Sequence, residues 1–224
     1  MPLRSCKVLL LMIAMCLGVV ACAGYRGGWE SLAYIGDPPP PAPPEDRTPF
    51  DADNRAVLNV SGLRLRVTIN NQLQTYDAQV YLYALPLSVD PRRTYSQSLA
   101  PGKTRVNVHV TPLEAGFVFR PELAVLYVAG KQSGGTASFE FGRWGSQGNR
   151  VTQGGRWDHR PVGPELHLTE IGRQYLLSVD SATPVPSPES HDIAVDLSRA
   201  LPAAEQPPLP LIRFLPIRWR ESYS

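Results

Sequence analysis

The stretch LRLRVTI at residues 63–69 alternates strictly between apolar and polar side chains. A period of two places the apolar residues on one face of an extended chain, so this stretch predicts a β-strand with one buried and one solvated face. The same period recurs at residues 79–84 and 105–110, and shorter apolar alternations continue to Leu197. Residues 123–128 are apolar throughout, which is typical of a strand covered on both faces.

Turn-forming residues separate these predicted strands. They are Asn70-Asn71, Asp90-Pro91, Pro101-Gly102, Ser133-Gly134-Gly135 and Gly154-Gly155. No stretch sustains a period of 3.6 residues, and residues 197–204 predict at most a short helix. About eight or nine short strands with frequent turns predict an all-β domain over residues 56–201, either an antiparallel β-sandwich or a barrel-like variant.

Proline is concentrated in the segments on either side of this domain. The chain holds 23 prolines, about twice the usual proportion, and residues 38–44 read PPPPAPP. Such a run favours polyproline II, which has no internal hydrogen bonds and acts as a spacer. We therefore expect residues 22–55 to form a disordered, proline-rich tether and residues 202–224 to form a proline-rich tail.

Cysteine and charge limit the functions open to the domain. Cys6, Cys16 and Cys22 all lie at the start of the chain, so the domain has no disulfide, thiol nucleophile or thiolate metal site. Arg4 and Lys7 precede every acidic residue, and the remainder of the chain is balanced in charge. A neutral domain lacks the basic surface of a general nucleic-acid binder, so we expect no nucleic-acid partner.

The first 21 residues have the pattern of a secretory signal peptide. Arg4 and Lys7 provide a positive start, and residues 8–20 form an apolar run of about thirteen residues, shorter than the roughly 20 that a membrane-spanning helix needs. The run closes with Val19-Val20-Ala21-Cys22. This sequence resembles the lipobox of bacterial lipoproteins, apart from Val19, where the family usually has leucine. The alternative is an ordinary signal peptide, or a short membrane anchor, that ends near a cysteine.

The resemblance covers the leader alone. It implies that Cys22 receives a diacylglycerol on its thiol and that the leader is cut just before it. It also implies that the acyl chains tether the protein to a membrane. In Gram-negative lipoproteins an Asp after the lipidated Cys favours the inner membrane, and Ala23 is not that signal. We therefore expect the protein at the periplasmic face of the outer membrane.

The sequence predicts no catalytic constellation, metal site or cofactor. None of the four histidines forms a His-x-His or His-x-x-x-His pair. Gly145-Ser146-Gln147-Gly148 lacks the glycine that a nucleophile elbow needs two residues before its serine, because Trp144 stands there. The glycines of this region have no strand–turn–helix context that would predict a dinucleotide loop.

The most distinctive stretch is residues 142–160, in which arginine, tryptophan and histidine occur among five glycines. Aromatic rings and guanidinium groups suit stacking on sugars and pairing with carboxylates or phosphates. The candidate ligand-binding residues are Arg143, Trp144, Arg156, Trp157, His159 and Arg160. The alternative is a long hairpin whose tryptophans fold back onto the core.

Three functional hypotheses follow. The first is a non-enzymatic envelope lipoprotein that binds or scaffolds an envelope protein or glycan. The second is a secretion-apparatus lipoprotein, because Pro101-Gly102-Lys103-Thr104 before an alternating strand is loosely similar to the type VI secretion lipoproteins. The third is an envelope hydrolase, which would require a polar cleft that gathers Asp158, His159 and a serine.

Overall fold

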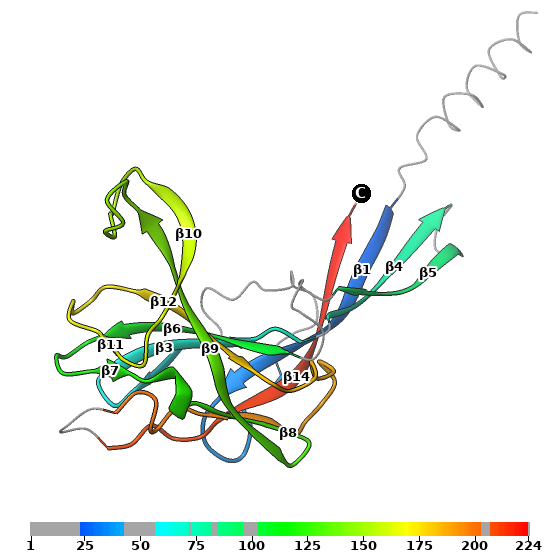
Figure 1. The fold of residues 1–224 in the computed structure, drawn as a ribbon. Coiled ribbons are helices and arrows are strands. Elements are labelled where there is room, and N and C mark those ends of the chain that lie inside the picture. The colour runs from blue at the N-terminus through cyan, green and yellow to red at the C-terminus, as the bar shows by residue number, and fades with distance from the viewer. Residues whose placement is uncertain are drawn as a thin grey trace, which may run out of the picture.

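The fold is seen in a computed structural model. The model describes residues 23–42, 57–71, 73–81, 85–95, 103–202 and 207–223. Only the backbone is described for residues 23–26, 73–81, 85–95 and 221–223. The described chain is all-β and antiparallel, and its main sheet curls until it is nearly closed into a barrel (Figure 1). The predicted all-β, barrel-like fold is confirmed.

The described residues form fourteen strands. In chain order they are β1 (Ala23–Tyr34), β2 (Val57–Val60), β3 (Leu63–Ile69), β4 (Leu73–Tyr81), β5 (Leu85–Tyr95), β6 (Thr104–Pro112), β7 (Val118–Phe119), β8 (Val125–Val128), β9 (Lys131–Trp144), β10 (Arg156–Pro161), β11 (Leu166–His167), β12 (Tyr175–Ser181), β13 (Ile193–Asp196) and β14 (Ile212–Tyr223). A 3-10 turn, η1 (Pro121–Leu123), precedes β8. Within the described residues, twelve strands form the main sheet in the order β2-β3-β6-β12-β9-β8-β13-β14-β1-β4-β5, with β10 paired to β9. β7 and β11 form a separate pair.

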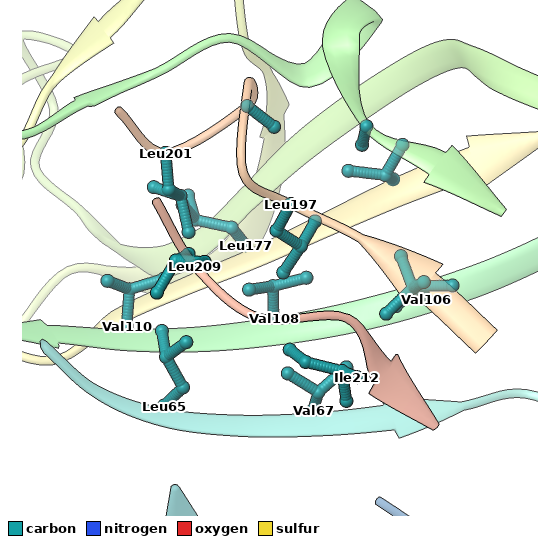
Figure 2. Close-up of a cluster of buried hydrophobic side chains, with 14 of the residues drawn as sticks. Leu65, Val67, Val106, Val108, Val110, Leu177, Leu197, Leu201, Leu209 and Ile212 are labelled. Carbon is teal, nitrogen blue, oxygen red and sulfur yellow. The ribbon is translucent and has the colours of Figure 1, made fainter. Parts of the chain in front are cut away.

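The core lies inside the curled sheet and follows the alternation seen in the sequence. On β3 the apolar residues of the 63–69 stretch are buried and the residues between them are more exposed. The same holds on β6, whose valines lie beside the apolar residues of β3 on the same face of the sheet, with Val108 opposite Val67 in the register (Figure 2). The cluster is completed from distant parts of the chain by Leu177, Leu197, Leu201, Leu209 and Ile212. This buried cluster is the rigid base from which the rest of the sheet extends.

Both predicted flanking segments contribute a strand, which corrects the predicted boundaries. Residues 23–34 of the expected tether form β1, and residues 212–223 of the expected tail form β14. The two strands pair along their length, from Gly24 opposite Tyr223 to Tyr34 opposite Arg213. β1 has no partner near it in sequence, and β14 pairs with the preceding strand β13 only at Ile212 and Arg213, so reading the chain in local windows missed both. Residues 36–42 of the proline-rich segment are exposed or nearly so, and residues 43–56 lie outside the described residues.

A second correction concerns Gly134-Gly135, which lie within β9 and not in a turn. The hairpin between β8 and β9 turns at Ala129 and Gly130, whose φ angles are 49° and 76°. Both residues adopt the left-handed conformation that such a tight turn requires. β9 therefore starts earlier than the sequence predicted. It is long enough to pair with β8, then β12, then β10.

Two β extensions leave the barrel (Figure 1). One is the β9–β10 hairpin. The other, here called the wing, consists of β4 and β5 with the parts of β1 and β14 that pair beside them. On β1, the pairing with β4 covers only the first half of the strand, residues 23–29. The wing therefore contains the start of β1.

Candidate functional site

All six candidate residues lie on the β9–β10 hairpin, which projects from the barrel (Figure 1). In the described chain β10 pairs with β9 alone, from Arg156 opposite Trp144 to Pro161 opposite Phe139. Trp157 lies directly opposite Arg143 in this register. The arrangement places the candidate residues together at the end of β9 and on β10.

The glycine-rich connection folds back on the hairpin. The amide of Gly148 donates to the Gly145 carbonyl at 3.0 Å, and the amide of Gly145 donates to the Asn149 carbonyl at 2.8 Å. The amide of Val151 then donates to the carbonyl of Arg143 at 3.0 Å. Three backbone hydrogen bonds over so few residues give the connection a defined conformation.

One face of the hairpin is a continuous row of aromatic and guanidinium groups. The ring of His159 contacts Phe139 and Phe141, with centroids 5.3 and 5.6 Å apart. The guanidinium of Arg143 lies 5.4 Å from the ring of Trp157, and Trp157 is 56% exposed. These five residues are named the aromatic face. Trp157 and His159 are exposed, whereas Phe139 and Phe141 are partly buried and the Arg105 guanidinium lies 5.3 Å from the Phe139 ring.

The opposite face is closed by an ion-pair cluster. Glu140 is 8% exposed and forms ion pairs with Arg150 and Arg173, the latter at 3.3 Å. Gly142 leaves room for this cluster, since a Cβ there would lie 3.2 Å from the guanidinium carbon of Arg150. Burial, and next the neighbouring Arg173, lower the pKa of Arg150. The Glu140 carboxylate therefore holds two arginines together against their mutual repulsion.

The same face holds Trp144 and Arg160 in fixed positions. The Arg160 guanidinium lies 4.1 Å from the Trp144 ring and donates to the Gly148 carbonyl. The Trp144 indole N–H donates to the carbonyl of Asp158 at 3.3 Å. Both side chains are thus engaged within the hairpin. Their main effect is to fix the connection against the two strands.

The six candidate residues divide into two groups. Arg143, Trp157 and His159 belong to the aromatic face, whereas Trp144 and Arg160 belong to the opposite face, and Arg156 is exposed beside them. The sequence analysis did not place Phe139 and Phe141 in the site. Their alternation with Ser138 and Glu140 had indicated the buried side of a strand. On β9 the buried positions are instead the even ones, because the ion-pair cluster fills the side that an apolar residue would otherwise occupy.

The arrangement around His159 bears on the hydrolase alternative. The His159 Nδ1 lies 3.6 Å from the Asp158 carboxylate, and both side chains are about half exposed. No serine in the described part of the chain hydrogen-bonds to this histidine.

Other predicted features fall elsewhere. Cys22 and the Pro101-Gly102 turn lie outside the described residues. Across the described ranges, no three side chains of histidine, cysteine, aspartate or glutamate converge as metal ligands would. The described chain also contains no helix with the length and apolar composition needed to cross a membrane.

Comparison of the chain with protein-family models, curated proteins and solved structures finds no match.

Proposed function

We propose that this chain is a lipid-anchored, non-enzymatic binding module of the bacterial envelope, and that its aromatic face binds an envelope glycan carrying anionic groups. The observation that carries the proposal is the exposure of Trp157 beside a guanidinium, on a hairpin that stands clear of the core. A ring held in this way presents its flat surface without needing the domain to rearrange.

The chemistry of the aromatic face matches such a ligand in two respects. Sugar rings carry C–H groups that pack on the flat face of an aromatic side chain, and Trp157 offers the largest exposed ring of the hairpin. Arg143 adds a cation at 5.4 Å from that ring, within reach of a carboxylate or phosphate on the same ligand. Peptidoglycan and lipopolysaccharide both combine sugars with anionic groups.

The hairpin is also rigid enough to bind without a large ordering cost. Its connection is fixed by backbone hydrogen bonds, and its far face is closed by the Glu140 ion pairs. Preorganised side chains lose little entropy when a ligand binds, which favours affinity from a small contact area.

The anchoring part of the proposal rests on the leader. The run that ends at Cys22 resembles a lipobox, and Cys22 is the last cysteine of the chain. Acylation at this residue would hold the domain at a membrane in the periplasm, where envelope glycans are the abundant anionic polymers. Mass spectrometry of the N-terminal peptide from a Gram-negative host tests it: a diacylglycerol on Cys22 is expected.

Binding is tested by co-sedimentation of the lipid-free chain with purified peptidoglycan sacculi, and by titration with lipopolysaccharide. Trp157→Ala is expected to weaken binding by about 2 kcal/mol, roughly thirtyfold, since an exposed tryptophan at the centre of a contact often dominates its energy. Arg143→Ala is expected to weaken binding more strongly at low salt than at high salt, because its contribution is electrostatic.

The matched control is Ile171→Ala. Ile171 is also a large, exposed apolar residue, at 60% exposure, but it lies in the loop before β12. This variant is expected to bind both glycans like the unaltered chain. Equal binding of the Trp157→Ala variant and the unaltered chain to both glycans would contradict the proposal for the aromatic face.

A further inference from the structure

The far end of the wing lies beside the first residue of β1. Ala23 pairs with Val80 near the end of β4, and Val80 pairs in turn with Pro86 on β5. The last described pair of this hairpin is Tyr81 opposite Leu85. The backbone thus brings the residue that follows Cys22 in the sequence to the end of the β4–β5 hairpin.

The sequence at this end of the hairpin is apolar. Residues 80–87 read VYLYALPL, without a charged residue. Val80 and Tyr81 end β4 and residues 85–87 begin β5, so both strands of the hairpin carry apolar or aromatic residues at this end. We name Val80–Tyr81 and Leu85–Leu87 the wing tip. A strand end of this kind is unfavourable in water unless something apolar covers it.

Charged residues occur in the wing only at a distance from the wing tip. Ala23 at the wing tip is three residues from Arg26, which pairs with Asp77 on β4 and Glu221 on β14. Asp77 in turn lies opposite Asp90 on β5. At about 3.3 Å per residue, this charged level lies roughly 10 Å from the pair that contains Ala23. The wing therefore changes from apolar to charged over about the depth of a lipid headgroup region.

We propose that the wing tip inserts into the lipid surface that holds the acyl chains of Cys22. This inference rests on the proposed lipid anchor and specifies how the anchored chain meets the membrane. The tether expected from the sequence would hold the domain away from the lipid. Because β1 begins at Ala23, an acylated Cys22 instead places the wing tip at the bilayer and the charged level at its headgroups.

The test uses residues 23–224 with a histidine tag ahead of Ala23, captured on vesicles of phosphatidylethanolamine and phosphatidylglycerol that contain a nickel-chelating lipid. Residues 23–224 have no cysteine, so Leu85→Cys introduces the sole thiol, which carries an environment-sensitive dye. Capture is expected to shift the dye emission to shorter wavelength. Adding Leu87→Asp to the same chain is expected to abolish the shift while capture continues.

The control is Ile171→Cys with the same dye, because this residue is exposed and belongs to the barrel. Its emission is expected to stay that of the aqueous protein. Equal emission changes at positions 85 and 171, or a shift that survives Leu87→Asp, would overturn the inference. Circular dichroism of each variant checks that the sheet is intact. Since the tag replaces the acyl chains, the result is independent of whether mass spectrometry finds Cys22 acylated.

Discussion

At the scale of the residue, His109 couples the stability of the barrel to pH. It lies on β6 directly opposite Arg66 on β3, with Leu176 of β12 on its other side. Burial, and next the charge of Arg66, lower the pKa of His109 below its usual 6.5. The imidazolium form is thus disfavoured in the folded chain but not in the unfolded one.

The sign of the pH dependence follows from this shift. Between about pH 6.5 and the lowered pKa, the unfolded chain binds a proton at His109 that the folded chain does not, so acidification through this range reduces the free energy of unfolding. We expect His109→Gln to show a smaller loss of stability between about pH 7.5 and pH 5.5 in urea titrations. His167→Gln, at an exposed position, is the control and should behave as the unaltered chain. Identical pH slopes for His109→Gln and the unaltered chain would show that His109 does not contribute.

At the scale of the element, β9 bends at Gly135. Its amide donates to the Ala124 carbonyl at 3.1 Å, and the register against β12 shifts at this point. A Cβ at Gly135 would lie 2.3 Å from the Pro121 carbonyl oxygen, whereas at Gly134 the nearest described atom would be 3.7 Å away. The two adjacent glycines therefore differ in whether a side chain can be added without a clash.

We expect Gly135→Ala to destabilise the chain by about 2 kcal/mol, because the added methyl group forces η1 away from β9. Gly134→Ala should change stability by less than about 0.5 kcal/mol, because its new contact has an ordinary van der Waals distance. Urea unfolding of both variants measures the difference. Equal stabilities would mean that η1 does not constrain β9 at this point.

The alternation on β3 and β6 was sufficient to predict those strands and their buried residues, because the period and the core coincide there. The hairpin site was only partly predictable. Its arginines and tryptophans stood out by residue type, but the division of Trp144 from Trp157 between two faces depends on the register with β10. The burial of Glu140 depends on Arg150 and Arg173, which no local pattern identifies as its partners.

At the scale of the whole molecule, the two ends of the chain complete the sheet. β14 lies between β13 and β1 in the sheet order, so the C-terminal strand joins the N-terminal strand to the barrel. Proline-rich sequence around these strands hid them from a local reading. Their pairing has the largest sequence separation in the fold, and such contacts form only after a costly loop closure. The sheet therefore cannot be completed until the last strand is available.

This arrangement predicts that residues 207–224 are required for folding. A chain ending at residue 206 lacks Phe214, Ile217 and Trp219, which are buried, and leaves β1 paired only with β4, along residues 23–29. We expect it to lose the cooperative thermal transition that near-ultraviolet circular dichroism follows in the full chain. A chain ending at Arg220 keeps every pair from Gly27 opposite Arg220 onward and should retain that transition. If the shorter chain unfolds like the full one, β14 is dispensable and the segment acts only as a tail.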